Sequence, residues 1–387
     1  MKKFLLFGAA AMMACAANAQ ITEVWAHNFE AEGSNVRNVA AWGNKAVVAN
    51  MATGLVEVYD ATGKTSQAFD VNAFTAAQQI GVTGEDGKFT QYAIGRGIDV
   101  DGAGNIVVNL NFPNAPSSTN FVAINPTTGD MIHVACEVPS PGAAARADFF
   151  GVTGNIFENA FIGTAIHQTN YVAVYNVFEG GQDADYSYLV NADEGTSLTN
   201  ETKVAWAKKT FDEDAETAPE FYVYNRSVGG VRYSDGIAAN PMVNLGESFA
   251  QGKASSSGVS AFEVNGVSYV VMPTPAADGS RQVDFKVVNV ATSEIVAQCE
   301  GKIAMGANYA QDFGASVNED GTVNIAHLVQ NKSLTMYKLT LGASAIEEVA
   351  ADNAAVEYYN LQGVKVANPE NGIFVKKQGA KATKVVL

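Results

Sequence analysis

The sequence repeats one strand-and-turn pattern six times. Each copy is a short apolar strand, and five of the six end in Asp or Asn, residues that close a strand by bonding their own backbone into a turn. Consecutive copies are 49 to 65 residues apart, counted between their last residues. The copies lie at residues 56–60, 121–125, 172–176, 221–225, 285–289 and 334–338. A large unit repeated this often constrains the fold more than any other feature of the chain.

Further strands accompany these copies. Upstream of several copies, a tight turn leads into another apolar strand, at residues 43–48, 104–108, 154–157, 266–271 and 321–325. A shorter strand comes before these turns, at 36–41, 97–100, 259–264 and 315–317, and a fourth follows the copy at 131–138 and 295–299. Four antiparallel strands per unit are typical of a β-propeller blade, because a ring of blades closes on itself and hides its sheet edges.

The number of blades follows from the number of units. The last unit has no obvious fourth strand after Leu339, so we expect the N-terminal strand at 21–25 to complete the sixth blade. Unit four has the weakest pattern, with residues 203–208 as its expected second strand. The irregular stretch 186–217 has room for a degenerate copy. The sequence therefore predicts an all-β propeller with six blades, and seven blades as the alternative.

The two ends of the chain differ from the repeats. Residues 1–19 have the pattern of a secretory signal peptide, with two lysines, an apolar run and a small-residue cleavage site. The run is shorter than the ~20 residues that span a bilayer. Cys15 leaves lipid attachment as an alternative. We expect an exported protein in the periplasm, at the cell surface or outside the cell.

The expected domain order follows. The propeller covers residues 20–341, a linker rich in Ala and Glu covers 342–355, and a C-terminal β segment covers 356–387. Strands are expected in this segment at 356–360, 372–376 and 383–387. About 32 residues bury too little surface to be stable alone.

The chain is strongly acidic. It has 24 Lys and Arg against 40 Asp and Glu, and removal of the two lysines in the signal segment leaves 22 basic residues. Nucleic-acid binders concentrate basic side chains that displace counterions from phosphates. We therefore expect no nucleic-acid partner and no membrane insertion. The sequence does not indicate an oligomeric state.

Two cysteines remain after the signal segment. In the repeat, Cys136 and Cys299 lie on the strands that follow the motif in units two and five. These units are opposite each other in a six-membered ring, beyond the ~7 Å between Cα atoms that a disulfide can bridge. We expect two free thiols, mostly buried.

The C-terminal segment carries a recognisable pattern. Tyr359-Asn360-Leu361-Gln362-Gly363, then Asn368-Pro369 and Gly372-Ile373-Phe374, and finally Lys384-Val385-Val386, resemble the C-terminal sorting segment of proteins exported by Bacteroidota. The propeller region is similar to secreted propellers of unknown function from the same bacteria. The resemblance implies a protein of the bacterial envelope, and it implies no catalytic residue.

Familiar catalytic and cofactor motifs are missing from the sequence. Asp99 and Asp101 begin a calcium-like stretch, but Ala103 and Leu110 occupy later ligand positions, and a hairpin turn explains the stretch better. The four histidines have no metal-binding spacing. There is no nucleophile elbow and no dinucleotide loop. We expect no cofactor and no metal, and we assign no catalytic residue.

Polar residues gather just before or within the first strands of the units. These strands line the central channel of a propeller, so their side chains should converge at a channel mouth. The candidate ligand-binding residues are Arg37, Asn38, Arg96, Asp99, Arg146, Asp148 and Asp312. They could bind a carboxylate or a sugar, or they could form a salt-bridged channel wall that holds the blades in register. Nearby aromatic residues, Trp42, Phe149, Phe150, Tyr309 and Phe313, could stack on sugars or pack between blades.

Two functions remain open. The first is a non-enzymatic binding or interaction module whose ligand is a glycan, a protein or a small molecule. The second is an enzyme, such as a metal-dependent lactonase or hydrolase or a polysaccharide lyase, whose carboxylates converge from several blades. Ligands of such enzymes are scattered along the sequence, so a missing motif does not exclude this function.

Overall fold

A computed structural model describes most of the chain. The described residues are 19–111, 118–137, 147–178, 186–191, 198–199, 201–212, 217–225, 230–249, 258–274, 285–300, 310–341, 357–359, 365–366, 373–378 and 381–386. The chain divides into two compact units. One is Ala19–Leu341, and the other comprises Met1–Asn18 and Gly342–Leu387.

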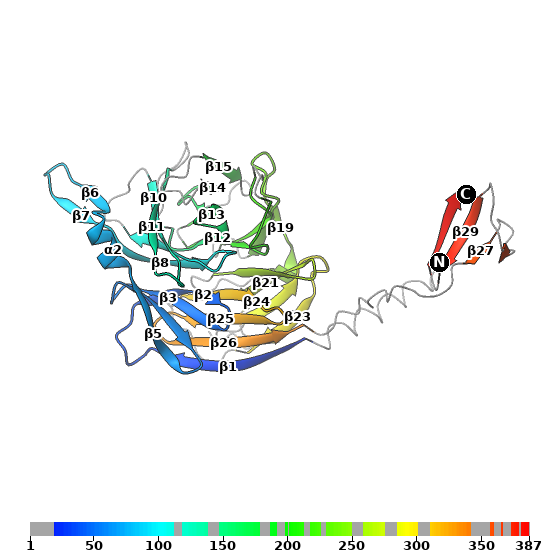
Figure 1. The fold of residues 1–387 in the computed structure, drawn as a ribbon, viewed down its shortest axis with the longest axis horizontal. Coiled ribbons are helices and arrows are strands. Elements are labelled where there is room, and N and C mark those ends of the chain that lie inside the picture. The colour runs from blue at the N-terminus through cyan, green and yellow to red at the C-terminus, as the bar shows by residue number, and fades with distance from the viewer. Residues whose placement is uncertain are drawn as a thin grey trace. The chain divides into compact units, whose positions relative to one another are not determined.

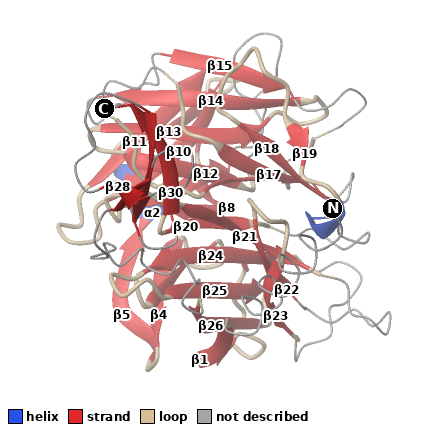
Figure 2. Ribbon diagram, turned by 90° about the vertical axis from the view of Figure 1, so that its right-hand side faces the viewer, coloured by secondary structure: helices blue, strands red, loops and turns tan. Residues whose placement is uncertain are grey.

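The unit Ala19–Leu341 is a six-bladed β-propeller, and its described residues form six four-stranded antiparallel sheets (Figures 1 and 2). The innermost strands, from blade 1 to blade 6, are β2 (Val36–Trp42), β8 (Ala93–Val100), β12 (Phe150–Asn155), β16 (Lys203–Trp206), β20 (Ser260–Val264) and β24 (Gln311–Val317). The second strands are β3 (Lys45–Asn50), β9 (Ile106–Asn111), β13 (Asn159–Ala165), β17 (Phe221–Asn225), β21 (Val267–Pro273) and β25 (Val323–Val329). The third strands are β4 (Leu55–Asp60), β10 (Ser118–Ile124), β14 (Tyr171–Phe178), β18 (Gly230–Ser234), β22 (Phe285–Asn289) and β26 (Ser333–Thr340). The outermost strands are β5 (Gly63–Asp70), β11 (Met131–Glu137), β15 (Tyr186–Asn191), β19 (Val243–Asn244), β23 (Ile295–Cys299) and β1 (Gln20–Asn28).

The ring closes through the N-terminal strand, as predicted. β1 pairs antiparallel with β26, from Gln20 opposite Thr340 to Asn28 opposite Ser333. In Figure 1 the blue β1 lies beside the orange β26. Each innermost strand contacts the next one around the ring, and β24 of blade 6 contacts β2 of blade 1. Strands from both ends of the propeller region therefore share one blade, and six blades, not seven, complete the circle.

The core lies between the blades. In β3, Val47 and Ala49 pack toward blade 2, whereas Ala46 and Val48 pack toward blade 6. Side chains alternate along a strand, so a blade with neighbours on both sides buries both faces of its inner strands. This explains why these strands read as continuous apolar runs in the sequence.

Glycines let the innermost strands approach closely. A Cβ on Gly314 of β24 would lie 2.3 Å from the Ala41 nitrogen of β2, and one on Gly151 of β12 would lie 2.4 Å from the Val204 oxygen of β16. Six strands crowd around a narrow axis, so backbone must pack on backbone there, which only glycine allows.

An insertion links blades 1 and 2. Helix α2 (Val71–Ala77) begins where the Asp70 side chain caps the Ala73 N–H, and strands β6 (Gly81–Thr83) and β7 (Phe89–Gln91) form a hairpin after it. The helix and hairpin extend outward from the blades (Figure 1). A short 3-10 helix, Glu247–Phe249, follows β19. Among the described residues, no helix is long and apolar enough to cross a membrane.

Two strand assignments differ from the prediction. In blade 4 the strand from Lys203 is the innermost one, and Phe221–Asn225 is the second, not the third. The connection between them is long, so the spacing that marks second and third strands elsewhere misleads here. In blade 3, Asn155 ends β12 and the next strand begins at Asn159, because residues 156–158 form the turn.

The second unit contains a small sheet. Its described strands are β27 (Glu357–Tyr359), β28 (Lys365–Val366), β29 (Ile373–Gln378) and β30 (Lys381–Val386), in the order β28-β27-β29-β30. The sequence predicts three of these strands and does not predict β28. The expected linker at 342–355 lies outside the described residues.

Candidate functional site

The channel along the ring axis has two different mouths. Side chains from the starts of the innermost strands meet at one mouth, which we call the N-mouth, and residues from their ends line the other, the C-mouth. The sequence-derived candidates are divided between the two.

The N-mouth is crossed by polar contacts between distant blades. Arg37 of β2 forms an ion pair with Glu201, which precedes β16 on the opposite side of the ring. The Asn38 side chain donates to the Asp148 carbonyl (3.0 Å), and Arg96 of β8 lies 3.4 Å from the Asp148 carboxylate. Three of the candidates, Asn38, Arg96 and Asp148, therefore hold one another, and Arg37 is held by Glu201.

A buried ion pair lies deeper in the channel. The Asp312 Oδ2 atom accepts hydrogen bonds from Lys203 Nζ (3.2 Å) and from the Val39 N–H (3.1 Å). Burial raises the pKa of Asp312 to about 6, and the Lys203 ammonium and backbone N–H groups oppose this rise. Lys203 also lies over the Phe149 ring, 5.8 Å from its centre. Asp312 is fully buried, so it is not a group that a ligand touches directly.

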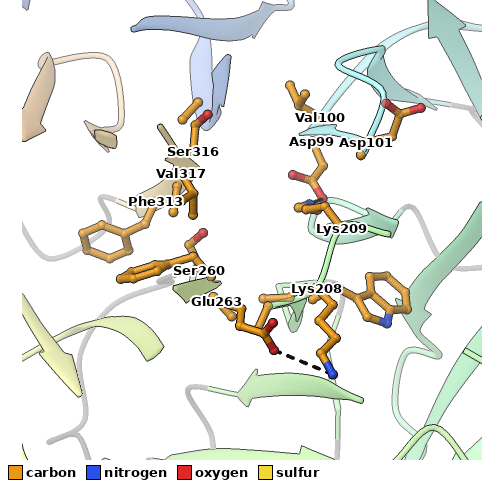
Figure 3. Close-up of a pocket in the computed structure, with 18 of the residues that line it drawn as sticks. Asp99, Val100, Asp101, Lys208, Lys209, Ser260, Glu263, Phe313, Ser316 and Val317 are labelled. Atoms are coloured by element: carbon orange, nitrogen blue, oxygen red, sulfur yellow. Dashed lines mark hydrogen bonds and ion pairs between the residues drawn. The ribbon is translucent and has the colours of Figure 1, made fainter. Parts of the chain in front are cut away.

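The C-mouth opens into a cavity of about 540 Å³. We call it the C-mouth cavity. Figure 3 shows its labelled side chains around an open centre, with Asp99 and Lys209 across from Ser316 and Val317. Small side chains line this space: Ala41, Ala205, Ala261 and Ala315 of the innermost strands, and Ala207 just after β16. The volume is within the range of small-ligand sites.

One wall of the cavity is fixed by Asp99. Its Oδ2 accepts hydrogen bonds from Lys209 Nζ (3.0 Å) and from the Val152 N–H (2.9 Å). Lys209 Nζ also donates to the Val152 carbonyl (3.0 Å). These contacts tie blades 2, 3 and 4 together, so Asp99 and Lys209 present a rigid polar wall. The structure thus separates Asp99 from the candidates at the N-mouth.

The opposite charges of Lys208 and Glu263 are held more loosely. Their side chains point toward each other across the rim (Figure 3), with 3.7 Å between Lys208 Nζ and Glu263 Oε2. They are 48% and 26% exposed. Exposed ion pairs of this kind contribute about 0–1 kcal/mol. Lys208 and Glu263 can therefore each give up this ion pair and bind a ligand instead, at little energetic cost.

The calcium-like stretch is a hairpin turn. Asp101 Oδ1 accepts from the Ala103 and Asn105 N–H groups, and Oδ2 accepts from the Ile156 N–H of blade 3 (2.8 Å). Burial raises the pKa of Asp101, and these hydrogen bonds oppose the rise. The turn joins two blades. Among the described residues, no three His, Cys, Asp or Glu side chains are grouped so that they could hold a metal ion.

The remaining candidates take structural places. Phe149, Phe150 and Phe313 are buried, whereas Trp42 is partly exposed and lines the C-mouth cavity. Burial lowers the pKa of His327 to about 3, and its Nε2 lies 3.0 Å from Gln311 Oε1. Arg146 and Tyr309 lie outside the described residues.

Sequence reasoning missed the residues at the ends of the innermost strands. Lys208, Lys209, Glu263, Ser260 and Ser316 line the C-mouth cavity. One signal was present, because Lys208-Lys209 is the only pair of adjacent lysines between residues 20 and 341. Its meaning depends on which mouth it faces, and the sequence does not reveal that.

Neither Cys136 nor Cys299 forms a disulfide. Cys136 of β11 is buried, and Cys299 of β23 is partly exposed. They lie on the outermost strands of blades 2 and 5, as expected. Burial also raises the pKa of the Cys136 thiol.

Comparison of the sequence with known protein families and with curated proteins finds no match. Solved structures give similarities at low sequence identity. One is a DUF4623 family protein from Bacteroides eggerthii (10% identity, TM-score 0.47, covering 82% of this chain and 73% of that one). Another is a protein of unknown function from Bacteroides caccae (13% identity, TM-score 0.42, covering 71% of this chain and 85% of that one). A third is a catalytically inactive virginiamycin B lyase from Staphylococcus aureus with quinupristin (11% identity, TM-score 0.41, covering 83% of this chain and 99% of that one). No functional conclusion follows from similarities at this level.

Proposed function

We propose that this protein is a non-enzymatic binding propeller that holds a glycan in the C-mouth cavity. The observation that carries the proposal is the cavity itself, an open space of about 540 Å³ whose rim offers hydrogen-bond donors and acceptors together. Lys208 and Lys209 donate, Glu263 and Asp99 accept, and the Ser260 and Ser316 hydroxyls do both.

A sugar matches this chemistry well. Its hydroxyl groups both donate and accept, so each can pair with one of the mixed groups on the rim. The loosely held Lys208 and Glu263 can turn toward such hydroxyls, whereas Asp99 and Lys209 stay fixed by Val152. The partly exposed Trp42 also lines the cavity. Lys45 Nζ lies over its ring, 5.1 Å from the centre, so the opposite face is the one on which a sugar ring can stack.

An enzyme acting at the same cavity is the second candidate. Asp99 and Glu263 are carboxylates on opposite sides of the cavity, in blades 2 and 5. Pairs of carboxylates flank the scissile bond in most enzymes that hydrolyse glycosides. Incubation of the protein with every glycan it binds, followed by product analysis, separates the candidates, since a binding module leaves the glycan intact.

The proposal places the protein in the envelope of a bacterium. Residues 1–19 would direct export, and the C-terminal segment would act as a sorting-like signal, in keeping with its sequence pattern. Mass spectrometry of the protein recovered from its producing cells tests this. We expect a mature N-terminus at Gln20, and an intact residue 1 in the recovered protein would contradict export by this signal.

Glycan binding itself is tested on an array with the full chain. We expect Lys208→Met and Glu263→Gln to weaken binding of any recognised glycan about tenfold, because each removes one charged hydrogen bond. Both side chains are partly exposed and their pair is weak, so the fold should tolerate these changes.

Arg96→Ala is the matched control. Arg96 is a charged channel residue of β8, but it faces Asp148 at the N-mouth. Its loss should leave glycan affinity unchanged. Absence of binding across a broad array, or equal affinities for the wild type and both cavity variants, would refute the proposed site.

A further inference from the structure

The C-mouth cavity extends down the channel to Lys203, the ionic partner of the buried Asp312. Lys203 lines the cavity, although only 4% of its side chain is exposed. An extended chain rises about 3.3 Å per residue, so Lys203 lies up to about 16 Å below Lys208 along the channel wall. The cavity therefore has a charged rim, and Lys203 is the basic residue that lines its deeper part.

Lys203 has spare donor capacity. A lysine ammonium carries three N–H donors. One of them bonds Asp312 Oδ2 (3.2 Å), and the ring of Phe149 covers another side of the group. Among the described residues, Asp312 is the ionic partner of Lys203. The ammonium thus has a donor left for a further acceptor.

Asp312 is incompletely satisfied. Its Oδ2 has two donors, but Oδ1 accepts no hydrogen bond of normal geometry from the described residues and is buried. Gly258 packs so tightly against it that a Cβ there would lie 1.7 Å from Oδ1. A carboxylate oxygen enclosed in this way, with no hydrogen bond of normal geometry, is better placed to carry a proton than a negative charge, although the Phe313 N–H opposes this effect.

The charges around Asp312 are few. β16 contributes the Lys203 ammonium, and β2 contributes the Val39 N–H. Among the described residues, the other charged groups named at the N-mouth pair with each other, Arg37 with Glu201 and Arg96 with Asp148. Lys203 is therefore the one charged group that contacts Asp312 in the described part of the chain.

Building on the proposed glycan site, we propose that the ligand is an acidic sugar whose carboxylate binds Lys203 while Asp312 takes up one proton. Without the ligand, the Lys203 ammonium is balanced by the Asp312 carboxylate. When a ligand carboxylate arrives, two carboxylates would share one ammonium in a buried site. Protonation of Asp312 Oδ1 by solvent removes the excess negative charge, and no covalent bond other than this O–H is formed.

The proposal fixes the direction of the pH dependence. A ligand carboxyl with an ordinary pKa near 4 stays ionised at pH 5 and above. Binding coupled to uptake of one proton weakens about tenfold for each pH unit above the pKa of Asp312. The acidic sugar should therefore bind well near pH 5.5 and poorly at pH 8.

The test is isothermal titration calorimetry of the full chain. The probes are an oligogalacturonate and an uncharged galactose oligosaccharide of equal length, titrated between pH 5.5 and 8. Repeating the pH 7 titration in two buffers with different ionisation enthalpies counts the protons taken up. We expect tighter binding of the acidic probe, an affinity that falls about tenfold per unit above pH 6.5, and uptake of nearly one proton.

Variants assign the proton to its residue. In Asp312→Asn the amide imitates the protonated acid, so binding of the oligogalacturonate should persist and lose its pH dependence. Lys208→Met should lower affinity but keep the slope with pH. The proton count on the wild type requires no variant, so it decides the question even if Asp312→Asn does not fold.

The outcomes separate this inference from the function on which it rests. Equal affinity for the two probes, or binding of the acidic probe without proton uptake, would overturn the inference and leave glycan binding standing. An unchanged pH slope in folded Asp312→Asn would also overturn it. Failure of both probes and of a broad glycan array would remove the proposed function and this inference together.

Discussion

The buried Asp312 gives the propeller a specific pH dependence of stability, which replacement by asparagine should remove. Burial raises its pKa from the ordinary 3.8 to about 6, and Lys203 opposes this rise. Between these pH values the folded protein binds more protons at this site than the unfolded chain does. Stability contributed by the protonated acid is therefore complete below pH 4 and is lost as pH rises through 6.

The magnitude follows from the difference between the two pKa values. Each pKa unit corresponds to about 1.4 kcal/mol, so the site should make the folded state about 3 kcal/mol less stable at pH 7 than at pH 4. Other groups act over the same range, such as Glu57, whose pKa is lowered because hydrogen bonds from Lys64, Tyr59 and Asn50 outweigh its burial. They are present in both proteins and cancel in the comparison.

The assay is urea unfolding of wild type and Asp312→Asn at several pH values from 4 to 7. Asparagine does not titrate, so the difference in unfolding free energy should change by about 3 kcal/mol in favour of the variant as pH rises. The absolute offset includes the cost of leaving Lys203 without its carboxylate, and only the change with pH is diagnostic. Asp86→Asn, on the exposed turn before β7, controls for the loss of one negative charge. A difference that stays within about 0.5 kcal/mol across the range would refute this account of Asp312.

Two further predictions concern packing. Gly314→Ala should destabilise the propeller by about 1–3 kcal/mol or more in urea unfolding, because the new Cβ would lie 2.3 Å from the Ala41 nitrogen. In the control Gly230→Ala, the nearest atom to the new Cβ is 3.6 Å away, so stability should change by less than about 1 kcal/mol. Equal effects of the two substitutions would contradict the close approach of β24 and β2. In thiol titration of the native chain, Cys299→Ser should remove one rapidly reacting thiol. Cys136→Ser should remove none, because Cys136 is buried. Rapid reaction of Cys136 would show that β11 is more accessible than the structure indicates.

The sequence contains most of the information about the blades. Apolar runs such as 45–50 and 118–124 bury alternate residues toward both neighbouring blades, and this pattern is local. The missing fourth strand after Leu339 and the extra strand before Val36 predict the ring closure. Blade 4 is the exception, because its long connection between β16 and β17 disrupts the spacing on which the prediction relied.

The site was less predictable. The sequence places Arg37, Asn38, Arg96, Asp148 and Asp312 at one mouth. The structure joins Asn38 and Arg96 to Asp148, whereas Arg37 pairs with Glu201 and Asp312 pairs with Lys203. The sequence does not indicate that Asp99, only three residues after Arg96, faces the other mouth together with Lys209. Successive residues of a strand rise about 3.3 Å, so three positions carry a side chain about 10 Å along the channel.

By itself, the sequence determined a closed ring of small sheets, the strand that closes it and the strands that carry the cysteines, because these depend on alternation and turn chemistry within short segments. Only the tertiary structure decided which polar groups meet. Lys203 and Asp312 are 109 residues apart, and Arg37 and Glu201 are 164 apart. Their contacts depend on how far each innermost strand is displaced along the channel axis relative to the others. That displacement is set by backbone packing between blades, at positions such as Gly151 and Gly314, and no local pattern in the chain encodes it.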